Sequence, residues 1–291
     1  MNLIELLALA AIWGASFLFM RVATPEFGPI ALIALRVGIA TLVLTPALRS
    51  AEARRQFRSR LRPLFVVGLT NSAVPFCLLA YSTLYVGAGL DSVLNATTPL
   101  WAAVISVAAF HGRIAGRQII GLLLGLGGVF VLVWHTLEAG GEGVLLATGA
   151  ALLATLSYGF AVNYSKRHLA GIRPFVTAFG SQFFAALVLS PLAVLVWPHH
   201  AVPLSIWACV AALGVLCTGI AYVLYFRLIE QVGSAYAASV TFLIPVFGVA
   251  WGALFLGEKI TPTMIVGAMI VLFGTALANG NRVFASIIKR A

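Results

Sequence analysis

The segment PLSIWACVAALGVLCTGIAYVLYF, residues 203–226, decides the fold class because it contains no Asp, Glu, Lys or Arg. About 20 predominantly apolar residues are enough for a helix to cross the hydrocarbon core of a bilayer. A run of this length and composition therefore predicts a transmembrane helix. Its apolar character is continuous and lacks strict alternation, which argues against a strand of an outer-membrane barrel.

Similar segments occupy most of the chain. The ten predicted spans are 3–20, 29–48, 63–84, 92–110, 118–134, 143–165, 174–197, 203–226, 234–256 and 260–281. Eight of them contain no charged side chain, and the other two contain one each, Glu5 and Arg36. The sequence thus predicts an all-α integral membrane protein with ten transmembrane helices, short loops and no soluble domain.

The composition supports this class of protein. Apolar residues make up 62% of the 291 residues and charged residues 9%, against roughly 45–50% and 25% in soluble proteins. So few charges cannot cover a water-soluble enzyme or binding module, and disorder, a disulfide scaffold and a collagen-like fibre are excluded as well. Cys77, Cys209 and Cys217 fall within spans and predict neither a disulfide nor a zinc site.

The basic residues indicate the orientation of the chain. With a cytoplasmic N-terminus, 15 of the 18 Lys and Arg residues lie in inside loops or the C-terminal tail, and only Arg21 and Lys259 lie in outside loops. This bias predicts cytoplasmic termini in a multi-pass protein of the cell inner membrane. The net charge of +10 is therefore better explained by the basic loop 49–62, an orientation anchor near anionic lipid, than by a nucleic-acid site.

The two halves of the sequence repeat. At a shift of about 145 residues, Trp13-Gly14 corresponds to Tyr158-Gly159, and at 146 Pro99 corresponds to Pro245. Each half, 1–137 and 138–291, holds five predicted spans. Because five is odd, the second half is expected to lie upside down relative to the first. Inverted repeats are typical of secondary transporters, which bind substrate at the midplane between the halves.

Several motifs carry a family resemblance. They are Ala11-Ile-Trp13-Gly14-Ala-Ser-Phe17, Asn95-Ala-Thr-Thr-Pro99-Leu100-Trp101, Thr241-Phe-Leu-Ile-Pro245 and Leu256-Gly257-Glu258-Lys259, with glycines from Gly121 to Gly128 and from Gly267 to Gly274. With these motifs, nearly the whole chain resembles the drug/metabolite transporter superfamily of the EamA type. Among its subfamilies the chain is most similar to the amino-acid exporters of the YddG type. One departure is that His111-Gly112-Arg113 replaces Gly257-Glu258-Lys259 in the first half.

The resemblance implies a ten-span exporter or permease with both termini in the cytoplasm. It also implies that the first four spans of each half line the pathway, while the fifth packs outside, often at a dimer contact. The glycines of the fifth and tenth spans fit close helix packing, either within the chain or between protomers. A homodimer through these helices is therefore an expectation.

Two prolines near the centres of their spans mark a candidate site. Pro99 and Pro245 would free the carbonyls of Asn95 and Thr241. A freed carbonyl at membrane depth needs a partner, which can be a neighbouring helix, water or a ligand. The alternative is a plain kink with local repacking.

Polar and aromatic residues at membrane depth extend this candidate site. Trp13, Trp101 and the repeat mate Tyr158 lie away from the interfaces, so they either wall a cavity or pack between helices. Gln182 either joins helices or lines the cavity. Arg36 lies about 10 Å from the outer boundary, at 1.5 Å per residue, and either binds a substrate carboxylate or extends to the interface.

Such a cavity suits a small neutral or zwitterionic metabolite, above all an amino acid with an aromatic or other hydrophobic side chain. Phosphorylated solutes would require several convergent basic residues. All five histidines lie in or beside loops and no central carboxylate is present, so facilitated export is favoured over proton coupling. The sequence predicts no cofactor and no metal.

Other functions fit the sequence less well than transport does. An intramembrane enzyme is not expected, because the His-Glu-x-x-His pattern and a catalytic histidine at membrane depth are missing. A substrate-selective channel and an exporter of drugs or lipophilic cations remain alternatives.

Overall fold

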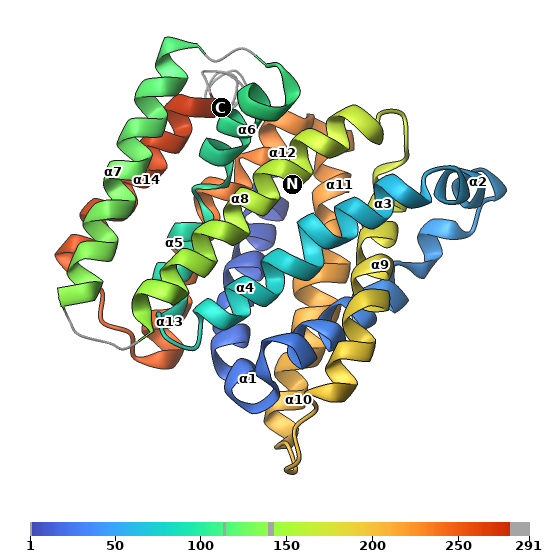
Figure 1. Cartoon of the computed structure of the whole chain (residues 1–291), viewed down its shortest axis with the longest axis horizontal. Helices are drawn as coiled ribbons and strands as arrows, with labels where there is room; N and C mark the ends of the chain where they lie inside the picture. The colour runs from blue at the N-terminus through green and yellow to red at the C-terminus, as the bar shows by residue number, and fades with distance from the viewer. Residues whose placement is uncertain (1, 113–114, 139–142, 280–291) are drawn as a thin grey trace.

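The computed structural model describes residues 2–112, 115–138 and 143–279, and all regular structure in these ranges is helical (Figure 1). In chain order the elements are α1 (Asn2–Leu44), η1 (Thr45–Leu48), α2 (Ala51–Ser59), α3 (Leu61–Gly68), η2 (Leu69–Ala73), α4 (Val74–Ser82), α5 (Ala88–Asn95), α6 (Thr98–Phe110), α7 (Gly116–Glu138), α8 (Val144–His168), α9 (Pro174–Leu195), α10 (Leu204–Ala211), η3 (Ala212–Ile220), α11 (Ala221–Val232), α12 (Ser234–Ala238), α13 (Val240–Leu256) and α14 (Pro262–Asn279). Here η1 is a 3₁₀ turn, and η2 and η3 are π-helical.

The prediction of an all-α membrane protein is confirmed at the level of helix length and composition. Within the described ranges, eight helical stretches are long and apolar enough to cross a membrane, and Pro262–Ala278 is a shorter apolar helix. The number of ten crossings remains a prediction, because the first two predicted spans fall in one stretch, Asn2–Leu48.

Helix α1 differs from the sequence prediction, which places a loop at 21–28. The helix continues through this segment and leaves helical geometry only at Gly28, where φ is 71° and ψ is 162°. A proline disfavours α geometry in the residue before it, and Pro29 follows a glycine that tolerates positive φ. The 43 residues of α1 would measure about 65 Å if straight, which is about twice the hydrocarbon thickness. Figure 1 shows the two parts of α1 running in different directions.

The predicted spans 92–110 and 234–256 are each broken into two helices. The first divides into α5 and α6, and the second into α12 and α13 with Ser239 between them. Both breaks precede the prolines that were expected to mark them. Pro99 lies in the first turn of α6, where its missing N–H costs nothing, whereas Pro245 lies inside α13.

The close contacts of two glycines match across the repeat. A Cβ added to Gly14 of α1 would lie 2.7 Å from the Cβ of Phe247 in α13. One added to Gly159 of α8 would lie 3.1 Å from the Cβ of Trp101 in α6. Since Gly14 corresponds to Gly159 and Trp101 to Phe247 in the repeat, each half contributes the same kind of contact.

A second glycine pair shows the same correspondence. A Cβ on Gly68 would lie 2.9 Å from the carbonyl oxygen of Ser181, and one on Gly214 would lie 3.1 Å from the carbonyl oxygen of Arg36. Gly68 directly precedes the π-helical η2, and Gly214 lies within the π-helical η3. These turns therefore occur at corresponding places in the two halves.

Helices α7 and α14 lie side by side at one edge of the molecule (Figure 1). Their glycines pack against each other within the chain. A Cβ on Gly128 would lie 3.0 Å from the carbonyl oxygen of Gly267, and one on Gly274 would lie 2.8 Å from the Cα of Gly125. Close packing within the chain accounts for these glycines, and the homodimer remains a prediction.

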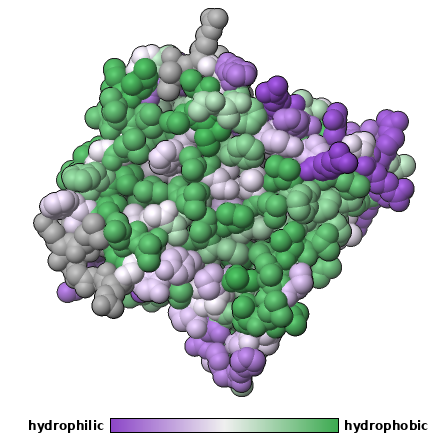
Figure 2. All heavy atoms as spheres, viewed as in Figure 1, coloured by the Kyte–Doolittle hydropathy of each residue, from purple (hydrophilic) through white to green (hydrophobic). Residues whose placement is uncertain are grey.

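The surface has a broad apolar region with polar ends. Figure 2 shows hydrophobic residues over most of the visible face, with hydrophilic residues gathered over α2 and at the tip that precedes α10. Within α2, the side chains of Arg54, Arg55 and Arg58 are exposed. The opposite face of α2 is apolar: the ring centroids of Phe57 and Phe179 are 5.6 Å apart, which anchors α2 to α9.

Candidate functional site

A cavity of about 340 Å³ lies in the middle of the helices and is lined by both halves of the chain. The lining residues are Trp13, Ser16, Phe17, Met20, Arg36, Asn71, Phe76, Leu79, Asn95, Ala96, Thr98, Pro99, Tyr158, Val162, Cys217, Thr218, Tyr222, Tyr225, Thr241 and Ile244. Several of them come from the irregular parts of the helices, including η2, η3 and the break between α5 and α6. Small-molecule sites are typically concave and mostly apolar, with a few convergent polar groups.

The structure brings most of the predicted site residues to this cavity. Those that line it are Trp13, Arg36, Asn95, Pro99, Tyr158 and Thr241. The other three, Trp101, Gln182 and Pro245, are not among its lining residues.

The three remaining residues pack between helices. Gln182 of α9 is fully buried and donates from Nε2 to Oγ of Ser72 in η2 at 2.9 Å, which joins two helices. The indole N–H of Trp101 is buried and has no hydrogen-bond partner within the described residues. Pro245 is buried in α13, next to the lining residue Ile244.

Local hydrogen bonds occupy the helix breaks. The carbonyl oxygen of Asn95 accepts from the hydroxyl of Thr98 at 2.8 Å, so this freed carbonyl already has a partner. The hydroxyl of Thr241 donates to the carbonyl oxygen of Ala238 at 2.8 Å. The polar group that Asn95 offers to the cavity is therefore its side-chain amide, whereas the hydroxyl proton of Thr241 is already bonded to the backbone.

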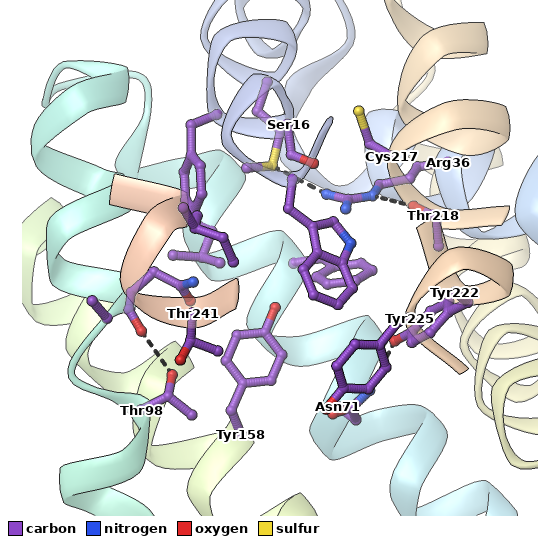
Figure 3. A pocket seen from close by; sticks show the side chains of 18 of the residues that line it. Ser16, Arg36, Asn71, Thr98, Tyr158, Cys217, Thr218, Tyr222, Tyr225 and Thr241 are labelled. Carbon is purple, nitrogen blue, oxygen red and sulfur yellow. Dashed lines mark hydrogen bonds between the residues drawn. The ribbon is translucent and has the colours of Figure 1, made fainter. Parts of the chain in front are cut away.

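Arg36 is buried at 4% exposure and turns into the cavity rather than to the interface. Its Nε donates to Oγ1 of Thr218 at 2.9 Å, and its Nη1 contacts Sδ of Met20 at 3.5 Å. The guanidinium carbon lies 4.0 Å from the centroid of the Phe76 ring, a cation–π contact. Figure 3 shows the guanidinium between Ser16 and Thr218.

Aromatic rings form much of the remaining wall. The ring centroids of Trp13 and Tyr225 are 5.3 Å apart, and Nδ2 of Asn71 donates to the hydroxyl oxygen of Tyr222 at 3.3 Å. Tyr158 directs its hydroxyl toward the middle of the cavity (Figure 3). Among the described residues that line the cavity, Arg36 alone carries a formal charge at neutral pH.

Sequence reasoning missed several lining residues. Cys217 and Thr218 lie in η3. The run around them is uniformly apolar, so it has no polar face from which the direction of their side chains could be predicted. Tyr222 and Tyr225 lie near the end of the predicted span 203–226, where aromatic residues are typical of a membrane interface. Thr98, directly before Pro99, could have been predicted to lie at the site, because its hydroxyl can donate to the carbonyl three residues earlier, which belongs to Asn95.

The part of the chain that the structure describes is all-helical and strongly apolar, and its halves enclose an aromatic cavity with one fixed charge. This is the architecture of a membrane transporter. The chain belongs to the EamA-like transporter family, whose model matches residues 2–134 and again 144–280. The two matches are the two repeats of the fold.

Named relatives cover nearly the whole chain. An uncharacterized transporter, YoaV, of Bacillus subtilis (strain 168) is 25% identical over 94% of this chain and 94% of its own length. A probable amino-acid metabolite efflux pump of Escherichia coli (strain K12) is 25% identical over 92% and 91%. A probable terminal-alkyne amino-acid exporter of Streptantibioticus cattleyicolor is 23% identical over 92% and 89%. All three are named as transporters or efflux proteins.

A solved crystal structure is similar along 99% of this chain and 98% of its own, with a TM-score of 0.62 and 20% sequence identity. At this identity the similarity shows the fold alone.

Proposed function

We propose that this protein is a secondary transporter that exports amino acids with aromatic or other hydrophobic side chains across the cell inner membrane. The observation that carries the proposal is the central cavity, whose wall combines aromatic rings with polar groups and a single arginine. Two of the relatives have names that refer to amino-acid efflux or export, which supports this substrate class.

Alternating access between two inverted halves is the proposed mechanism. The corresponding contacts of Gly14 with Phe247 and of Gly159 with Trp101 support it, because the same interface is formed twice with the halves exchanged. In an inverted repeat, one bundle rocks against the other around a site at the midplane. The position of the cavity, with lining residues from both halves, fits that requirement.

Export is proposed to be facilitated rather than proton-coupled. Proton-driven carriers usually use Asp, Glu or His along the pathway, and the described lining residues include none of these. Both termini are proposed to be cytoplasmic because of the bias of basic residues. The size of the cavity, about 340 Å³, falls within the usual range for small-molecule sites of about 300–1,000 Å³.

Flux through purified protein in liposomes tests this function. Labelled L-phenylalanine and L-leucine should enter protein-containing vesicles with saturable kinetics, and unlabelled amino acids should compete. Phosphorylated sugars should not compete. Flux that rises linearly with substrate would favour a channel, and competition by organic cations alone would favour a drug exporter.

A further inference from the structure

The single charge in the cavity, Arg36, has no oppositely charged partner among the described residues. The ion pairs within the described residues do not include Arg36. Its hydrogen-bond acceptors are neutral, the hydroxyl of Thr218 and the sulfur of Met20. A guanidinium has five N–H donors, so these two bonds leave most of them without an acceptor.

The fold itself does not require this charge. In the repeat, Ser181 of α9 corresponds to Arg36 of α1, and the carbonyls of both residues lie against a glycine of the other half. A small neutral side chain therefore serves the same packing position. A buried charge in a membrane helix is costly, and such residues face a partner, a water-filled cavity or a substrate pathway.

The guanidinium is held in place by its neighbours. Phe76 contacts its face, and Thr218 binds its Nε. Arg36 thus presents its remaining donors from a fixed plane at the cavity wall. Planar recognition by paired N–H donors is the geometry that a carboxylate accepts best.

The other lining residues determine which chemical groups a ligand can carry at the end that faces away from Arg36. Because the described lining residues include no Asp or Glu, a ligand ammonium would meet ring faces and hydroxyls, as at Trp13 and Tyr158. A cation without a carboxylate would place a second positive charge in a cavity that already contains Arg36. The site therefore selects for a carboxylate and does not require an amine.

We infer that Arg36 binds the substrate carboxylate and is the specificity-determining residue of the cavity. This inference rests on the proposed transport function and deepens it: every good substrate carries a free carboxylate. Because Arg36 occurs in only one half, the ligand lies in one orientation, with its carboxylate at α1 and its side chain among the aromatic rings.

Four matched compounds test the inference on the unaltered protein. They are L-phenylalanine, 3-phenylpropanoate, L-phenylalaninamide and phenethylamine. Ligand-dependent thermal stabilisation of the purified protein in detergent, measured at neutral pH, should occur with the first two compounds. The amide and the amine should bind at least about ten-fold more weakly, the loss expected when a charge-assisted hydrogen bond is removed.

Three variants add a second measurement. Arg36→Gln should lose at least about ten-fold in affinity for L-phenylalanine, and its preference for the acid over the amide should disappear. Arg36→Lys keeps the positive charge but lacks the planar pair of N–H donors. It should therefore retain part of the affinity for L-phenylalanine and part of the preference for the acid over the amide. Arg117→Gln removes an exposed basic residue at the start of α7 and should bind like the unaltered protein. If Arg36→Gln does not fold, the four-compound measurement decides alone.

The outcomes separate the inference from the proposed function. Equal binding of acid and amide overturns the inference but leaves amino-acid transport intact. Binding of 3-phenylpropanoate without L-phenylalanine supports the inference and removes amino acids from the proposed function. Binding of phenethylamine alone, or of none of the four compounds, overturns the inference.

Discussion

The side chain of Glu258 accepts a hydrogen bond at Oε1 from the backbone N–H of Ala88, with 2.6 Å between nitrogen and oxygen. Its Oε2 accepts from the N–H of Gly89 at 3.0 Å. Helix α5 begins at Ala88, so the carboxylate satisfies N–H groups that a helix leaves free at its N-terminus. The segment after α13 is thereby joined to the first half of the chain, and the corresponding position, Gly112, has no side chain to do the same.

Removal of this carboxylate should weaken the fold. We expect Glu258→Ala to lower the free energy of unfolding by about 2 kcal/mol, the range for hydrogen bonds to a charged group, and Glu258→Gln to lower it less. Thermal unfolding of the purified proteins ranks the variants by stability. Lys259→Ala, at the exposed neighbouring position, is the control; a loss equal to that of Glu258→Ala would show that the contact is not specific.

The tight contact at Gly159 predicts a difference between two glycines of α8. A Cβ at Gly159 would lie 2.8 Å from the backbone nitrogen of Ala102, whereas a Cβ at Gly149 would meet nothing within 4 Å. Gly159→Ala should therefore reduce the yield of folded protein. Gly149→Ala should be neutral or stabilising by up to about 1 kcal/mol, the helix-propensity gain. Size-exclusion profiles after mild heating compare the two, and equal profiles would contradict the packing.

The position of residues at the cavity predicts which substitutions change transport. Trp13→Ala and Asn95→Ala should reduce amino-acid flux several-fold without loss of folded yield, because both side chains line the cavity. Trp101→Ala should instead lower thermal stability, because Trp101 packs against Gly159 outside the lining. Initial rates in liposomes, normalised to the amount of inserted protein, separate the two effects. A selective flux defect in Trp101→Ala would place the pathway differently.

Facilitated export predicts that a proton gradient has no effect. The residue most suited to contradict this is Asp91, which is fully buried in the first turn of α5 and has no hydrogen-bond partner for either carboxyl oxygen within the described residues. We expect flux to be unchanged by an imposed pH gradient at zero membrane potential, and Asp91→Asn to behave in the same way. Acceleration by the gradient that disappears in Asp91→Asn would identify Asp91 as a proton carrier.

The fold class could be predicted from the sequence because apolar runs of membrane length leave few alternatives. The segment 203–226 alone indicates a transmembrane helix, and the structure contains the corresponding stretch Leu204–Val232. The helical conformation of residues 21–27 was missed, because Pro25 and Pro29 look like loop residues in a sequence. In the structure Pro25 lies in the helical segment before Gly28 and Pro29 in the helical segment after it, and Gly28 alone is non-helical.

The cavity was predictable only in part. Pro99 and Asn95 were found because proline has a defined effect on the backbone around it, and both residues line the cavity. Thr218 and Tyr222 were missed because a uniformly apolar helix has no polar face from which its rotation can be read. The π-helical turn of η3 shifts that rotation further, and no sequence signal marks such a turn.

Glu258 shows a similar limit. The sequence shows that this acidic residue occurs in one half only, but its partners are backbone N–H groups of Ala88 and Gly89, which lie 170 and 169 residues away in the chain. Backbone partners leave no trace in the amino-acid types around them. The contact could be found only from the structure.

Cysteine labelling of two corresponding loops tests the inverted repeat most directly. In a background with Cys77, Cys209 and Cys217 replaced, single cysteines would be introduced by Ser59→Cys and Ala201→Cys, both at exposed positions. A membrane-impermeant maleimide added outside intact cells should label position 201 and leave position 59 unlabelled until the cells are opened. Labelling of both positions from the same side of the membrane would mean that the two halves are parallel, and the account of a cavity between inverted halves would be wrong.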